Sequence, residues 1–310
     1  MSKMSENQGR ALRSKATHAT PAGSDVVTTS PPLSKRRLSK RLQEARKATG
    51  MTADQVVDRA RQLGGGRWSA SKITRLERNE WVRPKLEDVE LLLDIYDVDP
   101  VMRAECVRLV KEARQKEWAD SYSDVLGRGW LTGMEPGATR IRDVAIAVIP
   151  GLLQTQAYAR AVIVGGGIVD ASEIDRRVEA RMLRQRILGV GAEGPKYWAV
   201  IDEAALRKVP ASLREHQFQH LIDVQRPDLR IQILPDAAGL HAAISGGFTI
   251  LDFEDDSSVG YSEDAATQRV HEEIEDVEAF DLVYQYVSAS ALGVQESLAL
   301  LESLLSSPTS

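Results

Sequence analysis

Basic and hydroxyl side chains alternate through the segment from Ser69 to Arg78, which reads Ser-Ala-Ser-Lys-Ile-Thr-Arg-Leu-Glu-Arg. Ile73 and Leu76 lie three residues apart, so in a helix they would form an apolar face and leave the polar residues outside. A guanidinium or ammonium group can hydrogen-bond O6 and N7 of guanine, and hydroxyl groups can bond several base edges. The segment therefore predicts a helix that reads bases in the major groove of DNA. The side chains expected to contact bases are Ser71, Lys72, Thr74, Arg75 and Arg78.

A second set of polar residues surrounds this helix and could bind the DNA backbone. Thr52 and Gln55 are spaced as a capping box, in which each side chain bonds the backbone N–H of the other residue at a helix start. Contacts to phosphate fix the register of a protein on DNA without reading its sequence. The residues expected to bind phosphate are Thr52, Gln55, Arg67, Ser69, Asn79 and Arg83.

These side chains require a compact helical domain to position them, and the sequence predicts five short helices over residues 34–118. Apolar residues recur at helical spacing in each of them, and residues with strong capping preferences mark their ends. The boundaries are signalled by Gly50 after the first helix, Thr52 and Gln55 at the second, Ser69 before the third, Pro84 opening the fourth and Asp99-Pro100 opening the fifth. The turn between the second and third helices, Leu63 to Arg67, is longer than a tight turn and contains three consecutive glycines.

The remaining chain divides into three parts. Residues 1–33 are rich in Ser, Thr, Ala, Gly and Pro and are expected to be a disordered tail. Residues 119–137 carry several glycines and are expected to connect the helical domain to residues 138–310. This last part is expected to be a mixed α+β domain with a small antiparallel sheet, so the fold class is α+β overall. Its expected strands are 197–201, 229–234, 248–253 and 258–262, and its expected helices include 155–164, 172–188 and 277–305.

The charge distribution separates the two domains. Up to Arg83 the chain has 18 Lys and Arg against 7 Asp and Glu, whereas after Glu117 it has 16 against 29, and the whole chain carries −5. A chain with a basic N-terminal part and an acidic C-terminal part is suited to bind a polyanion through the N-terminal part alone. No stretch is apolar enough for a membrane span or a secretory signal, so we expect a cytoplasmic protein, associated with the nucleoid when bound to DNA.

Other chemistry is weakly signalled. His216 and His220 share one helical face, but no third ligand is evident and Gln217 stands where a metalloprotease would have Glu. The acidic residues Asp252, Glu254, Asp255 and Asp256 are interpreted as a solvated turn, and Cys106 as a buried side chain. We expect no catalytic residue, no metal, no cofactor and no enzymatic activity.

The segment from Leu38 to Asp99 resembles the Xre-type, lambda-repressor-like helix-turn-helix regulators. The matching residues are the first helix Leu42-Gln43-Glu44-Ala45-Arg46, Gly50-Met51-Thr52, Ser71 to Arg78, and Pro84. This chain departs from the family pattern at two points. It has Val57 where the family has a small residue, and its turn before the third helix is long. The resemblance implies a transcriptional regulator that binds a pseudo-palindromic operator as a homodimer.

The second half resembles the large C-terminal domain of WhiJ-like regulators, which are often described as antitoxin-like. The matching segments are 149–155, 158–161, 180–185, 202–206, 233–235 and 247–248. The resemblance implies a domain that senses a small-molecule effector or binds a small protein partner. The arginine-rich face of residues 176–186 favours an acidic protein or an anionic ligand, although a solvated face is equally compatible with it.

Two functions therefore stay open, besides an enzyme directed to DNA, which we do not expect. In the first, the chain is a sequence-specific transcriptional regulator whose C-terminal domain responds to a ligand or partner. In the second, it is an antitoxin-like protein that neutralises a partner protein and binds DNA to regulate its own synthesis.

Overall fold

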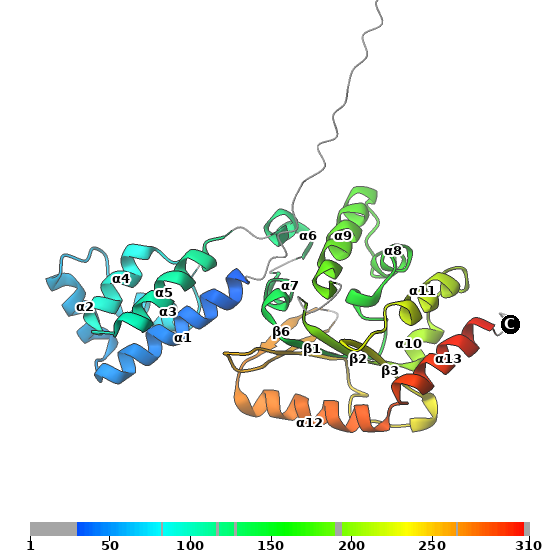
Figure 1. Cartoon of the computed structure of the whole chain (residues 1–310). Coiled ribbons are helices and arrows are strands. Elements are labelled where there is room, and N and C mark those ends of the chain that lie inside the picture. The colour runs from blue at the N-terminus through cyan, green and yellow to red at the C-terminus, as the bar shows by residue number, and fades with distance from the viewer. Residues whose placement is uncertain are drawn as a thin grey trace, which may run out of the picture.

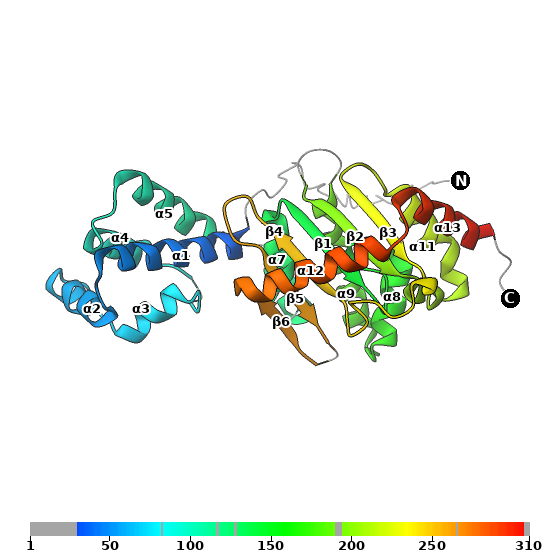
Figure 2. The same cartoon turned by 90° about the horizontal axis from the view of Figure 1, so that it is seen from below.

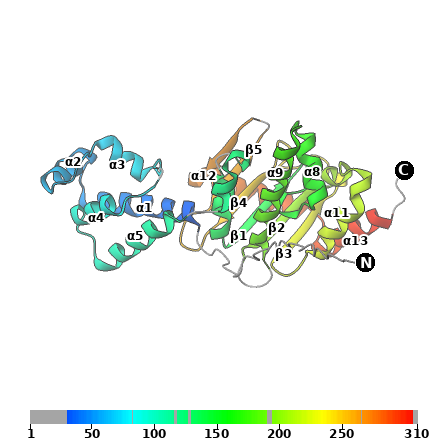
Figure 3. The same cartoon turned by 90° about the horizontal axis from the view of Figure 1, so that it is seen from above.

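The computed structural model describes residues 30–81, 83–115, 118–126, 129–189, 194–264 and 266–306. A helical head, made of α1 to α5, lies beside a larger body that contains a sheet, and α1 joins the two (Figures 1, 2 and 3). This arrangement confirms the expected α+β fold class. Residues 1–29 of the expected tail lie outside the described residues.

The head has the five expected helices, and local side-chain caps start most of them. They are α1 (Pro31–Thr49), α2 (Ala53–Gln62), α3 (Ala70–Glu77), α4 (Leu86–Ile95) and α5 (Pro100–Ala113). The capping box forms as expected: the Thr52 amide donates to Gln55 Oε1 at 2.8 Å, and the Gln55 amide donates to Thr52 Oγ1 at 3.3 Å. Gly50 ends α1 in the left-handed conformation, with φ of 70°.

Two helix starts differ from expectation. α1 begins at Pro31, inside the expected tail, because Ser30 caps it by accepting a hydrogen bond from the Leu33 amide at 3.2 Å. α4 begins at Leu86 instead of Pro84, because Lys85 has extended backbone dihedrals and Pro84 precedes the first helical turn. The expected domain boundary at residue 34 therefore falls within a continuous helix.

The body is built on a six-stranded sheet with strand order β3-β2-β1-β4-β5-β6. Its strands are β1 (Arg140–Ala145), β2 (Lys196–Asp202), β3 (Leu229–Leu234), β4 (Phe248–Asp252), β5 (Val259–Glu263) and β6 (Gln268–His271). The short connection from the head contains η1 (Trp118–Tyr122), α6 (Ser123–Leu126), α7 (Trp130–Met134) and η2 (Glu135–Gly137). The other body helices are η3 (Gly151–Leu153), α8 (Gln156–Gly165), α9 (Ala171–Arg184), η4 (Gln185–Leu188), α10 (Glu203–Arg207), α11 (Ala211–Asp223), η5 (Asp236–Ala238), α12 (Ile274–Ser290) and α13 (Val294–Ser306).

The sheet is mixed, so the expectation of a small antiparallel sheet was wrong in this respect. β2 lies between β1 and β3 and pairs in parallel with both. The other three pairs, β1 with β4, β4 with β5 and β5 with β6, are antiparallel. Helices connect β1 to β2 and β2 to β3, as parallel neighbours require. The four expected strands are present, and β1 and β6 are the two that sequence patterning missed.

Helices cover both faces of the sheet. α12 lies across one face, and α8, α9 and α11 lie on the other (Figure 1). The core on the α12 side includes Val200, Phe248 and Val287, whereas the opposite core includes Tyr197, Phe218 and Leu301. A separate core fills the head. Across the described ranges, no helix has the length and apolar character needed to cross a membrane.

Candidate DNA-binding site

Helix α3 presents one polar face because its other face is packed into the head. Ile73 and Leu76 are 1% and 5% exposed and belong to the head core. Ser71, Arg75 and Arg78 are exposed, and their spacing of four and three residues places them along one face. Ser69 caps the helix by accepting a hydrogen bond from the Lys72 amide at 3.2 Å. The structure therefore brings these three expected base-contacting residues together.

Among the described residues, the guanidinium groups at this site have no competing protein partner. Arg75 and Arg78 are exposed, as are Arg67 before α3 and Arg83 after it. Within the part of the chain that the structure describes, none of these four side chains makes a hydrogen bond or ion pair. Such cations keep their full capacity to bind base edges or phosphates.

Lys72 and Thr74 are placed differently from the other expected base-contacting residues. Lys72 Nζ lies 2.9 Å from Asp88 Oδ2 on α4 and 3.9 Å from the centre of the Trp68 ring. Thr74 Oγ1 donates to the Ala70 carbonyl at 3.0 Å and is partly buried. Lys72 would have to leave Asp88 to reach a base, so this geometry favours Lys72 as a link between α3 and α4. The Lys72–Asp88 pair was not expected from the sequence.

The long turn between α2 and α3 is tightly packed. Gly65 lies so close to its neighbours that a Cβ there would be 2.5 Å from Leu91 Cδ2 and 2.7 Å from the Ala60 carbonyl oxygen. Trp68 is 5% exposed and shares the head core with Ile73. Trp68 and Ile73 lie on either side of the Ser69 cap, at the two positions of a hydrophobic staple. Such a staple fixes the angle at which the chain enters a helix. An aromatic residue directly before a capping serine was the sequence signal for this arrangement.

The remaining expected phosphate-binding residues lie at helix ends. Thr52 and Gln55 are exposed at the start of α2, where backbone N–H groups and the helix dipole favour an anion. Asn79 follows α3 with φ of 58°, a left-handed conformation that Asn tolerates better than most residues. Whether any of these residues touches DNA stays a prediction.

Glu77 secures the back of α3. Its carboxylate accepts hydrogen bonds from Arg46 Nε at 2.5 Å and Nη2 at 2.8 Å, so α3 is tied to α1. The hydrogen bonds that the Arg46 guanidinium donates to this carboxylate raise the pKa of Arg46. This pairing directs negative charge away from the face that carries Arg75.

Charged groups of the body interact mainly with each other. Arg184 binds Glu135, Arg176 binds Asp124, Arg177 binds Glu173, and Arg181 donates to Gln154 Oε1. The arginine-rich face is therefore largely neutralised within the body, which weakens the expectation of an acidic partner. The acidic turn was also misinterpreted: Glu254 and Asp255 are exposed, but the Asp256 side chain is 1% exposed and pairs with Arg36.

Metal-binding and thiol chemistry find little support in the geometry. His216 and His220 lie on α11, and across the described ranges no group of three or more His, Cys, Asp or Glu side chains could hold a metal ion. Cys106 is buried, as expected, and burial raises the pKa of its thiol to about 11. A thiol with this pKa is a poor nucleophile at neutral pH.

The fold and the exposed cations of α3 define a protein with a helix-turn-helix head and an α+β body, and two family models match accordingly. A model described as a helix-turn-helix domain matches residues 37–106, and this match supports a DNA-binding regulator. A model described as a domain of unknown function, DUF5753, matches residues 130–303, more than half of the chain. The chain therefore belongs to the DUF5753 family. No curated protein and no solved structure matches it significantly.

Proposed function

We propose that this protein is a sequence-specific transcriptional regulator of the Xre type that inserts α3 into the major groove. The observation that carries the proposal is the exposed face of Ser71, Arg75 and Arg78, whose guanidinium groups have no partner in the described chain. Arg75 lies in the middle of this face, and its guanidinium can bind O6 and N7 of guanine bidentately. Thr52, Gln55, Arg67 and Arg83 would bind phosphates on either side.

Base reading and phosphate binding can be separated by two substitutions. Arg75→Ala should cost about 1–3 kcal/mol on the preferred operator and relax specificity at one base pair. Arg83→Ala should weaken binding to all sequences alike and lower the slope of log affinity against log salt by about 1. Binding would be measured by fluorescence anisotropy on operators found by genome-wide mapping. Equal, sequence-independent losses for both variants would contradict the assigned roles.

The proposal includes a homodimer on a pseudo-palindromic operator. Two heads related by a two-fold axis read half-sites about 34 Å apart, one turn of B-DNA. Sedimentation equilibrium of the free protein and of its operator complex tests this stoichiometry. One protomer per operator would refute the dimer while leaving DNA binding intact.

A second candidate, an antitoxin-like protein of the WhiJ type, is favoured by an apolar segment between β3 and β4. Leu240 is 91% exposed and Ile244 is 54% exposed there. Contiguous exposed apolar patches are typical of surfaces that bind another protein, and these two side chains would belong to such a patch. The proposal predicts that native extract yields a small protein bound to the wild type and lost with Leu240→Ser and Ile244→Ser together. Metabolite-dependent thermal stabilisation without such a protein would favour a ligand-sensing body instead.

A further inference from the structure

Helix α1 belongs to the cores of both head and body. Leu33, in its first turn, is 4% exposed within the body core, whereas Leu38 and Leu42 are fully buried in the head core. Ser30 Oγ donates a hydrogen bond to the Gly133 carbonyl of α7, which anchors the helix start on the body. The head is therefore carried on a helix that is embedded in the body by a single turn.

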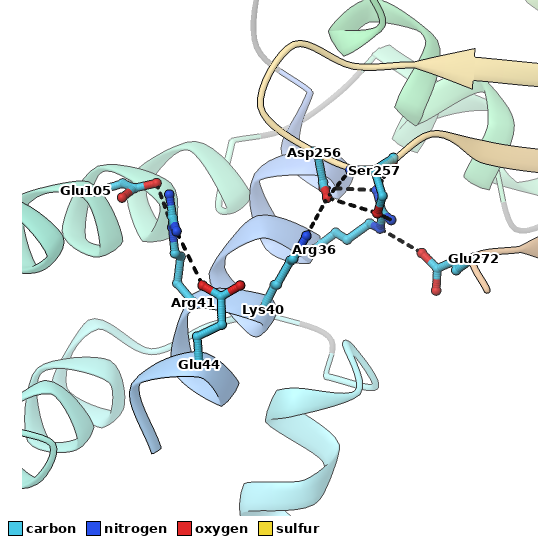
Figure 4. A network of polar contacts seen from close by, with 8 residues as sticks. All are labelled: Arg36, Lys40, Arg41, Glu44, Glu105, Asp256, Ser257 and Glu272. Atoms are coloured by element: carbon cyan, nitrogen blue, oxygen red, sulfur yellow. Dashed lines mark hydrogen bonds and ion pairs between the residues drawn. The ribbon is translucent and has the colours of Figure 1, made fainter. Parts of the chain in front are cut away.

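Beyond that turn, α1 contacts the body through charged groups (Figure 4). Arg36 Nη1 lies 2.9 Å from Asp256 Oδ2, in the loop between β4 and β5, and Arg36 Nε lies 2.8 Å from Glu272 Oε1. Arg36 also donates to the carbonyl and the hydroxyl of Ser257 at 3.2 and 3.0 Å. Lys40 Nζ is 3.5 Å from Asp256 Oδ1. We call Arg36, Lys40, Asp256, Ser257 and Glu272 the latch.

Among the described residues, the contact between head and body at the latch is polar, with no apolar cluster shared across it. The head and body cores are separate clusters, and α1 contributes to both. A cleft of about 350 Å³ lies next to the latch, between α1, α5 and the β4–β5 loop. Its lining is entirely charged: Arg37, Lys40, Arg41, Glu44, Glu105, Arg108, Asp255 and Asp256. Domains without a large apolar interface are expected to move relative to each other unless something else holds them.

We propose that Asp256 is a positioning residue, which binds Arg36 and Lys40 of α1 and thereby fixes the head in one orientation on the body. The Arg36 side chain is 11% exposed and that of Asp256 is 1% exposed, so salt screens this pair less than a surface pair. Charge-assisted hydrogen bonds to a guanidinium also impose direction, which a point contact would not. The inference does not depend on the head binding DNA.

The test measures the distance between head and body in the full chain. Spin labels are attached at Gln62→Cys on α2 and Gln295→Cys on α13, both exposed positions, while the native Cys106 is buried. Pulsed electron paramagnetic resonance should give one narrow distance distribution for the wild type. Asp256→Ala and Arg36→Gln should each broaden it by about twofold or more, and combining them should add little.

Asp255→Ala is the matched control. Asp255 is the neighbouring carboxylate, lines the same cleft and is exposed without an ion pair in the described chain. Its loss should leave the distance distribution unchanged, and Asp256→Glu should keep most of the wild-type narrowness because the negative charge remains. Circular dichroism checks that each variant is folded. The proposal is overturned if Asp256→Ala and Arg36→Gln keep the wild-type width, or if Asp255→Ala broadens it equally.

Discussion

Two carboxylates of the body, Glu135 and Asp143, differ in the groups that donate hydrogen bonds to them. Glu135 is fully buried and accepts hydrogen bonds from Arg184 Nε at 2.7 Å and Nη2 at 2.5 Å. Asp143, on β1, accepts instead from the Tyr197 hydroxyl at 2.8 Å. Burial raises the pKa of Asp143 to about 6, although this hydrogen bond and the Arg184 charge oppose the shift. Compared with an aspartate in water, Asp143 in the folded body therefore keeps its proton to a higher pH, although a carboxyl with this pKa is mostly ionised at pH 7.

This shift predicts a pH dependence of stability. An acid whose pKa is higher in the folded state binds more protons when folded, so its contribution to stability falls as pH rises from about 4 through about 6. Relative to Asp143→Asn, which does not titrate, the wild type should lose about 2 kcal/mol of unfolding free energy between pH 4 and pH 7. Urea unfolding of both proteins across this range measures the difference. A constant difference would mean that the Asp143 pKa is ordinary.

At the scale of elements, the turn between α2 and α3 shows how a departure from a compact motif is accommodated. The turn is longer than a tight turn and contains three glycines, yet Gly65 approaches α2 and α4 closely and Trp68 is buried. Gly64, the second residue after α2, has a left-handed backbone conformation with φ of 75°. The orientation of α3 is therefore fixed by packing despite the length of the turn.

Adjacent glycines in this turn should respond differently to a methyl group. Gly65→Ala forces backbone or Leu91 to move and should lower the unfolding free energy by about 1–3 kcal/mol. A Cβ at Gly66 would meet nothing within 4 Å, so Gly66→Ala should change the unfolding free energy by less than about 0.5 kcal/mol. Thermal unfolding followed by circular dichroism compares the two. Similar losses in both variants would show that the turn is not packed as described.

We also expect Gly65→Ala, but not Gly66→Ala, to weaken operator binding, because α3 is displaced.

At the scale of the whole molecule, α1 makes the two domains mechanically dependent on each other. Gly137 permits this, because a Cβ there would lie 2.5 Å from Leu33 Cδ2. Ser34 Oγ donates to Glu112 Oε2 at 2.8 Å and Arg41 Nε lies 3.1 Å from Glu105 Oε1, so α1 is also tied to α5. A change at the first turn of α1 should therefore destabilise the body, whereas a change further along the helix should destabilise the head.

Two leucines of the same helix test this dependence. Leu33→Ala should cost about 2–5 kcal/mol, and the loss should speed amide hydrogen exchange in β1 and β2 of the body. Leu38→Ala, one turn further along, should cost a similar amount but speed exchange in α2 to α5 instead. Hydrogen exchange with mass spectrometry resolves the two regions. If Leu33→Ala affected only the head, the first turn of α1 would not belong to the body core.

Features that depend on near neighbours can be derived from the amino-acid sequence alone. The starts of α2, α3 and α5 follow from Thr52, Ser69 and Asp99, and the exposed face of α3 follows from the spacing of Ile73 and Leu76. Caps and helical periodicity act within a few residues, so they are visible in the sequence.

Tertiary structure alone decided the features that join distant residues. The β1 strand was missed because Arg140, Arg142 and Asp143 interrupt its apolar pattern, and their partners lie far along the chain, as with Arg142 and Asp252. Arg36 and Asp256 are 220 residues apart in the sequence. Lys72 forms an ion pair with Asp88 on the next helix. The parallel pairing of β1, β2 and β3 also depends on how helices cross the sheet. Burial, which makes such charges acceptable only in pairs, is a property of the folded chain and not of its local order.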